Sequence, residues 1–232
     1  SDYFSKGERK ANHGNCSQPC RWSYRLVEET RPNEYLEINQ DDRGSHILSP
    51  KDLCLVKQLP QLIDAGIDSF KVEGRTKSLY YVSAVAKAYR QAIDDVLKNP
   101  SADLDKYFLE LQKVGNRGYT TGFALGDNNG ESYSYDISKG LAGADFLCEF
   151  KGDVKDGNFF LVKIKNKMLV GDDVEIITPD EQFVAKVEAV KNEDGENLEL
   201  GNTNDDVYVK FSQAPENYKY ALVRTVGIKT YN

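Results

Sequence analysis

The C-terminal part of the chain carries a pattern that only a few folds satisfy. From Ala144 onward, short apolar or alternating runs are separated by turn signals such as Lys155-Asp156-Gly157 and Glu193-Asp194-Gly195. Alternation with a period of two is typical of strands that bury one face, and glycine-containing turns join antiparallel neighbours. The sequence therefore predicts a small antiparallel β-barrel or sandwich. Its strands are expected at 146–150, 159–164, 174–177, 183–190, 198–200, 207–211 and 220–228.

Residues 1–97 follow a different, partly helical pattern. The sequence predicts a helix that starts at the capping sequence Ser49–Asp52 and is kinked at Pro60, then a strand over 67–72. A glycine turn and a long helix over 79–97 follow. This order is that of a βα unit, which builds parallel sheets or barrels covered by helices. About 100 residues do not close an eight-stranded barrel. Residues 1–97 therefore form either a smaller α/β layer or the C-terminal part of an α/β barrel.

Residues 98–143 separate the two patterns. One further helix within 104–114 precedes a stretch from Gly115 to Gly143 that holds seven glycines and little periodicity. Such composition is typical of connectors. The sequence therefore predicts an α/β part at 1–97, a helix and connector at 98–143, and a β-barrel domain at 144–232. The expected fold class is α/β followed by all-β.

Composition and charge exclude several functions. No apolar run reaches the ~18 to 20 residues that a membrane-spanning helix needs, and the N-terminus SDYFSKGERK lacks the apolar stretch of a secretory signal. We therefore expect a cytoplasmic protein without membrane contact. The formal charge is −7, and residues 144–232 contribute most of it, with 11 basic and 17 acidic side chains. A polyanion such as RNA would have to meet a local basic patch in the first part of the chain.

The four cysteines do not form a dense disulfide framework, which favours a reducing compartment. Cys54 and Cys148 lie in apolar runs, where a free cysteine behaves as a small buried hydrophobe. Cys16 and Cys20 are separated by three residues in the loop-like segment GNCSQPCRW, where two thiolates can converge. They are candidate ligands of a metal or iron–sulfur site, and an unliganded loop pair is the alternative.

The turn between the predicted strand and the long helix is the clearest candidate site. Arg75 can bind a carboxylate or phosphate with two parallel hydrogen bonds, Lys77 adds a positive charge, and Ser78 lies at the helix N-terminus. Glu73 could orient Arg75 or transfer a proton, so Glu73 and Arg75 are the catalytic candidates. The alternative is structural, with Glu73 and Arg75 as an ion pair and Ser78 as a helix cap.

The histidine inventory argues against a hydrolytic triad. Such a triad needs a base next to a nucleophile. Only His13 and His46 are present, and neither lies in a recognisable nucleophile or metalloprotease motif.

The first part of the chain closely resembles a known family, the collagenase-like peptidases of unassigned catalytic type, or U-thirty-two peptidase family. The resemblance covers most of residues 1–125 and rests on the segments GNCSQPCRWSYRLVEETRP, SPKDLCLVKQLPQLIDAGIDSFKVEGRTKSLYYV and NRGYTTGF. It implies the C-terminal part of a (β/α)8-type barrel followed by a small antiparallel β-barrel domain. It also implies an iron–sulfur cluster held by four cysteines. Cys16 and Cys20 match the last two, and the first two would lie upstream of Ser1.

The resemblance also implies a function. Bacterial relatives support prephenate-dependent 5-hydroxylation of the wobble uridine in tRNA, and a small dicarboxylate such as prephenate suits a substrate-binding site made of Arg75, Lys77 and Ser78. The partners would then be tRNA or another protein. The family name implies instead a peptidase that acts on proteins or peptides. A non-catalytic scaffold that binds a partner is the third alternative.

Overall fold

The computed structural model describes residues 39–41, 44–46, 49–126, 133–134, 143–155 and 158–227. The chain divides into two compact units. One comprises Ser1–Cys54 and Arg117–Gly140, and the other comprises Leu55–Asn116 and Leu141–Asn232. Among the described residues, no helix is long and apolar enough to cross a membrane.

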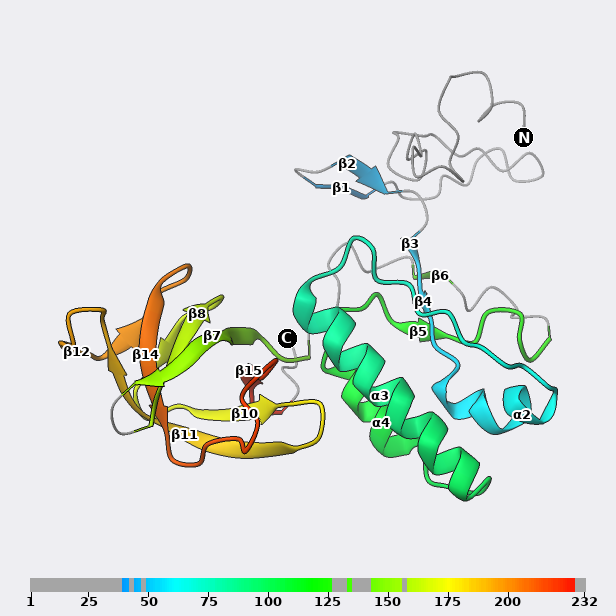
Figure 1. Cartoon of the computed structure of the whole chain (residues 1–232). Coiled ribbons are helices and arrows are strands. Elements are labelled where there is room, and N and C mark those ends of the chain that lie inside the picture. Colours follow the sequence, from blue (N-terminus) through cyan, green and yellow to red (C-terminus); the bar gives the residue numbers. More distant parts are fainter. Residues whose placement is uncertain are drawn as a thin grey trace, which may run out of the picture. The chain divides into compact units, whose positions relative to one another are not determined.

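The second unit contains a closed antiparallel β-barrel (Figure 1). Six strands form the ring in the order β10-β15-β7-β8-β14-β11, and β10 pairs with β11 to close it. Their bounds are β7 Phe146–Lys155, β8 Phe159–Ile164, β10 Asp173–Ile177, β11 Gln182–Lys191, β14 Asp206–Phe211 and β15 Leu222–Thr225. Strand β12 (Asn197–Leu198) extends the sheet beside β11, and β9 (Met168–Leu169) pairs with β13 (Leu200–Gly201). The predicted antiparallel barrel is confirmed.

The barrel interior follows from strand alternation. Strands β8 and β14 each bury every second side chain, as the period-two pattern predicts. The rings of Phe150, Phe160 and Phe211 pack together, with centroids 5.2–6.5 Å apart. The remaining core is aliphatic and includes Leu147, Val162, Ile164, Met168, Val174, Ile176, Val187, Val190, Val207, Val209 and Val223.

Helices precede the barrel in the same unit. A 3-10 turn, η3 (Val56–Gln58), leads into α2 (Leu59–Asp64), and the long helix α3 (Leu79–Lys98) is followed by α4 (Asp105–Gln112). Helices α3 and α4 lie side by side (Figure 1). They bury an apolar stripe of Val85, Ala88, Ala92, Val96, Tyr107 and Leu111. The predicted long helix over 79–97 is therefore confirmed to within one residue.

Two sequence predictions in this region are wrong. Residues 67–72 form no strand, since they have no regular secondary structure and their backbone pairs with no described strand. Ile67 and Val72 remain 42% exposed. No helix starts at Ser49. Helix α2 begins at Leu59, and Pro60 lies in its first turn, where it interrupts no hydrogen bond and causes no kink. The α/β fold class therefore rests on helices and short strand pairs rather than on a βα unit at 67–97.

The first unit consists of short strand pairs. Strand β1 (Asn39–Asp41) pairs with β2 (Gly44–His46), and β3 (Ser49–Pro50) pairs with β6 (Tyr133–Ser134). Strand β4 (Asp52–Leu53) runs parallel to β5 (Tyr119–Thr120). The Asp52 carboxylate accepts hydrogen bonds from the Arg117 backbone N–H (3.1 Å) and guanidinium (2.8 Å). This distant partner explains why Asp52 does not cap a helix. The predicted domain limits at 97 and 143 stay predictions.

Candidate functional site

Residues 73–78 form an exposed turn that leads directly into α3. The Lys77 N–H donates to the Gly74 carbonyl at 3.0 Å, and the Arg75 N–H donates to Glu73 Oε1 at 3.0 Å. A Cβ at Gly74 would lie 2.9 Å from Val82 Cγ2, so glycine allows the turn to approach α3 closely. The Lys77 ammonium lies 4.8 Å from the centroid of the Tyr81 ring.

Ser78 is the N-cap of α3. Its backbone is extended (φ −69°, ψ 160°), and its hydroxyl accepts a hydrogen bond from the Tyr81 N–H at 3.2 Å. The structure thus brings the predicted site residues Glu73, Arg75, Lys77 and Ser78 into one turn at the positive end of a 20-residue helix. The hydrogen bond of Glu73 is made to the Arg75 backbone and fixes the turn. What these residues bind stays a prediction.

The cysteines divide into two groups. Cys16 and Cys20, the predicted cluster ligands, lie outside the described residues. Cys54 and Cys148 are free thiols at 7% and 0% exposure, as predicted for small buried hydrophobes. Burial raises the pKa of Cys148 far above its ordinary value, so this thiol is not a nucleophile. No group of three or more His, Cys, Asp and Glu side chains that could hold a metal ion occurs within the described ranges.

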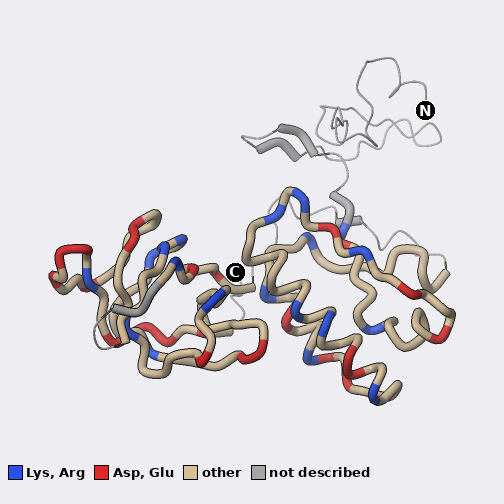
Figure 2. Tube along the Cα trace, in the orientation of Figure 1, with Lys and Arg blue, Asp and Glu red and all other residues tan. Residues whose placement is uncertain are grey.

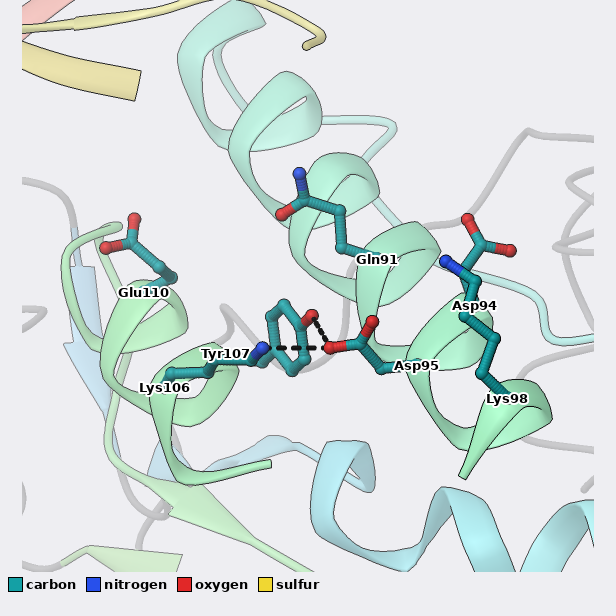
Figure 3. Close-up of a pocket in the computed structure, with 7 residues that line it drawn as sticks. All are labelled: Gln91, Asp94, Asp95, Lys98, Lys106, Tyr107 and Glu110. Atoms are coloured by element: carbon teal, nitrogen blue, oxygen red, sulfur yellow. Dashed lines mark hydrogen bonds and ion pairs between the residues drawn. The ribbon is translucent and has the colours of Figure 1, made fainter. Parts of the chain in front are cut away.

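A hollow of about 470 Å³ opens between α3 and α4 (Figure 3). Figure 3 shows Lys106 and Tyr107 converging on Asp95, which accepts hydrogen bonds from the Lys106 ammonium (2.8 Å) and the Tyr107 hydroxyl (2.6 Å). These two donors lower the pKa of Asp95, with the Lys106 hydrogen bond as the largest cause. The arrangement joins the C-terminal end of α3 to α4, and we assign it a structural role.

A buried cluster of charges joins the helices to the barrel. Arg224, on β15, has no exposed surface, and its guanidinium contacts three partners. It donates to Glu175 of β10 at 2.6 Å, to Glu110 of α4 at 2.5 Å and to the Tyr80 hydroxyl of α3 at 3.2 Å. Lys113 completes the cluster, 2.6 Å from Glu110 and 3.4 Å from Glu175.

The electrostatics of the cluster favour the charged forms of Glu110, Glu175 and Arg224. Burial raises the pKa of Glu110, but hydrogen bonds from Lys113 and Arg224 outweigh it and leave the pKa lowered. Burial likewise raises the pKa of Glu175, but the hydrogen bond and charge of Arg224, with a hydrogen bond from Gln182, leave it lowered. Burial lowers the pKa of Arg224, but Tyr80, Glu175 and Glu110 raise it to a net increase. Arg224 lies within the strand that the sequence predicts over 220–228, and the strand pattern does not predict a buried charge there. A single arginine between Val223 and Val226 was the available signal.

Comparison with known proteins gives matches over both parts of the chain. Residues 1–134 match the model for Peptidase family U32, and residues 143–224 match the Peptidase family U32 C-terminal domain. The tRNA hydroxylation protein P of Escherichia coli is 30% identical over 266 residues, which cover 96% of this chain and 57% of the relative. An uncharacterized protease of Methanocaldococcus jannaschii is 44% identical over 131 residues, or 56% of this chain and 31% of that protein.

A solved structure is also similar. The C-terminal domain of a U32 peptidase of Geobacillus thermoleovorans is 24% identical, with a TM-score of 0.31, and covers 35% of this chain and 99% of that structure. The chain spans a little over half the length of the E. coli relative. Because the family model covers more than half of the chain and the C-terminal model covers the barrel, the chain belongs to peptidase family U32.

Proposed function

We propose that this protein supports prephenate-dependent 5-hydroxylation of the wobble uridine in tRNA. The observation that carries the proposal is the match to the E. coli tRNA hydroxylation protein P, which extends over 96% of the chain, both the helical part and the barrel. The partner is then tRNA, and the small ligand is a dicarboxylate.

The turn at 73–78 supports this proposal chemically. The planar guanidinium of Arg75 can bind one carboxylate with two parallel hydrogen bonds, and Lys77 supplies a second positive charge two residues away. Both lie in the exposed turn before the first free N–H groups of α3, where an anion is favoured. In this mechanism Arg75 and Lys77 bind the dicarboxylate. Glu73 accepts a hydrogen bond from the Arg75 N–H in the same turn, and its carboxylate could transfer a proton.

The proposed cofactor is an iron–sulfur cluster in the full-length protein. Cys16 and Cys20 would supply two of its four thiolate ligands, and a bound cluster supplies single-electron chemistry.

Nucleoside analysis tests the proposal. A strain without the gene is complemented with full-length wild type, Arg75→Ala, Arg75→Lys or the control Arg90→Ala, which removes an exposed arginine paired with Asp94 on α3. We expect Arg75→Ala to weaken dicarboxylate binding by roughly 10- to 100-fold, because a charge-assisted contact is worth about 1.5 to 3 kcal/mol. Hydroxylated wobble uridine should fall accordingly. Arg75→Lys should be nearly as poor, since an ammonium does not reproduce the fork.

Three outcomes would contradict the proposal or the site assigned to it. Normal hydroxylation in a stably expressed Arg75→Ala strain would remove the turn from the site. Arg75-dependent cleavage of gelatin, without any change in tRNA, would favour the peptidase that the family name and the M. jannaschii relative indicate. If wild type restores neither activity, the scaffold alternative gains support.

A further inference from the structure

The outward face of strands β8, β14 and β11 combines aromatic and cationic side chains. Alternation on β8 turns Phe159, Leu161 and Lys163 outward, because Phe160, Val162 and Ile164 are buried. Alternation on β14 turns Tyr208 and Lys210 outward in the same way. The strand register places Phe159 opposite Lys210, Leu161 opposite Tyr208, and Tyr208 opposite Lys191 of β11. We name this surface the lysine–tyrosine face: Phe159, Leu161, Lys163, Lys191, Tyr208 and Lys210.

Side-chain contacts show that the lysine–tyrosine face is continuous. The Lys191 ammonium reaches across β14 and lies 4.5 Å from the centroid of the Phe159 ring. Lys210 lies 3.0 Å from Glu188, and both side chains are 41% exposed. Phe159, Leu161 and Tyr208 are all partly exposed. Aromatic rings and lysine ammonium groups therefore lie close together on this surface.

The charge of this face differs from that of the rest of the region. On the neighbouring strand β7, Glu149 is flanked by Lys151 of the same strand (3.3 Å) and by Lys165, which follows β8 (3.1 Å). Among side chains that the structure describes, the face and this flank hold five lysines and three carboxylates, Glu149, Glu188 and Asp206. The other side chains that the structure describes in residues 144–232 comprise four basic and twelve acidic groups. The loop that leads to β12 carries Glu193, Asp194 and Glu196. It follows directly on Lys191, at the edge of the face, and lies away from β7 and β8 (Figure 1 and Figure 2).

We propose that the lysine–tyrosine face binds single-stranded RNA, and that in the proposed function, on which this inference rests, it holds the anticodon loop of the tRNA. Bases of a single strand stack on aromatic side chains, while lysines contact the phosphates between them. A sheet surface that presents aromatic rings and lysines at every second residue matches the alternation of bases and phosphates along a single strand. The segregation of charge favours a polyanion at this face within an otherwise acidic domain. This proposal differs from the expectation that a polyanion would meet a basic patch in the first part of the chain, and that expectation stays a prediction.

Binding measurements with the full 232-residue chain test the proposal. Fluorescence anisotropy over a range of KCl concentrations would compare an unmodified anticodon loop oligonucleotide with a blunt RNA duplex. We expect Tyr208→Ala to weaken binding of the loop by roughly 5- to 150-fold without changing the salt dependence, because stacking is not electrostatic. Lys191→Gln and Lys210→Gln should each lower the slope of log K against log salt by about 0.7. Tyr208→Phe keeps the ring and should bind like wild type.

A matched control lies on the opposite side of the ring. Lys219 also lies over an aromatic ring, 5.1 Å from the Tyr220 centroid, but just before β15, three positions from β14 around the barrel. Lys219→Gln should leave binding unchanged. The proposal is overturned if Tyr208→Ala binds like wild type while remaining folded, if the duplex or polyglutamate binds as tightly as the loop, or if Lys219→Gln matches Lys191→Gln.

Nucleoside analysis separates this inference from the proposed function. If full-length protein with both Tyr208→Ala and Lys191→Gln binds RNA and hydroxylates tRNA normally, the lysine–tyrosine face is not the RNA-binding surface, and the proposed function is retained. If RNA binding depends on the lysine–tyrosine face but wild type does not restore hydroxylation, the face is an RNA-binding surface and the proposed function is wrong.

Discussion

The barrel and the helical segment that precedes it are stabilised in different ways. Each of the six barrel strands has two antiparallel neighbours, so the ring satisfies its own backbone hydrogen bonds around an apolar core. Helices α3 and α4 bury an apolar stripe, but they meet the barrel through Tyr80, Glu110 and Lys113, which surround Arg224 and Glu175. The ring satisfies its own backbone, whereas the helices are held against it by a few buried charges and by the Tyr80 ring, which stacks on Phe146 of β7 at 5.4 Å between centroids.

This difference has an energetic consequence. A buried ion pair contributes little net stability relative to apolar packing, but removal of one partner leaves an uncompensated charge and is strongly destabilising. A backbone contact lies beside the charges, where the Lys87 ammonium donates to the carbonyl oxygens of Thr178 (2.7 Å) and Glu181 (2.8 Å). The polar contacts between helices and barrel therefore select one geometry more than they add stability.

The largest expected effect comes from Arg224. We expect Arg224→Met to lower the free energy of unfolding by about 3 to 5 kcal/mol, because Glu110 and Glu175 would lose their main buried partner. The control Arg90→Met removes an exposed i,i+4 pair with Asp94 and should cost below about 1 kcal/mol. Urea denaturation of the full chain measures both. Equal effects for the two variants would show that the buried cluster is not what joins the regions.

The second prediction concerns the point where the chain enters the barrel. A Cβ at Gly143 would overlap the Gln112 carbonyl oxygen and lie 2.8 Å from Lys113 Cα, at the end of α4. Both obstacles are backbone atoms, so Gly143→Ala should destabilise the protein by about 1 to 3 kcal/mol. Gly115→Ala is the control, since a Cβ there meets open space. If both variants unfold at the same urea concentration, the close approach of the connector to α4 is wrong.

Acid should weaken the same connection by a smaller amount. The pKa values of Glu110 and Glu175 are lowered in the folded protein, so their stabilisation is complete above the unfolded value of about 4.3 and is lost as pH falls through the folded values. The loss is smaller than for Arg224→Met because protonation neutralises the carboxylates instead of leaving them charged. Urea denaturation between pH 3 and about pH 6 should show a steeper decline for wild type than for Glu110→Gln. Parallel curves would contradict the assignment.

Local patterns explain why the barrel could be predicted from the sequence. The alternation in β8 and β14 is contained within each strand, and the stripe of α3 lies within one helix, so neighbouring residues were sufficient. The prediction that Asp52 caps a helix was wrong because Asp52 binds Arg117, which lies 65 positions away in the sequence. The prediction of a strand over 67–72 was wrong because a strand requires a paired neighbour, which local propensity does not reveal.

The same distinction between local and distant contacts applies to the candidate site and the buried charge cluster. The gathering of Glu73, Arg75, Lys77 and Ser78 in one turn could be predicted because these residues are consecutive or nearly so. The cluster around Arg224 could not, since its members come from four elements and only their meeting makes an arginine in an apolar strand favourable.

The smallest expected effect concerns Ser78, and it separates a helix cap from a ligand. Ser78→Ala should cost about 1 kcal/mol, because the Tyr81 N–H loses its acceptor, whereas Thr76→Ala in the same exposed turn should change little. Ser78→Asp keeps an acceptor and adds a negative charge at the helix N-terminus, so it should restore the free energy of unfolding. That charge would repel a dicarboxylate next to Arg75 and Lys77. If the turn is the binding site, Ser78→Asp should therefore be stable in urea yet lose tRNA hydroxylation. If Ser78 only caps α3, Ser78→Asp should keep both, and the anion site must lie elsewhere in the full-length protein.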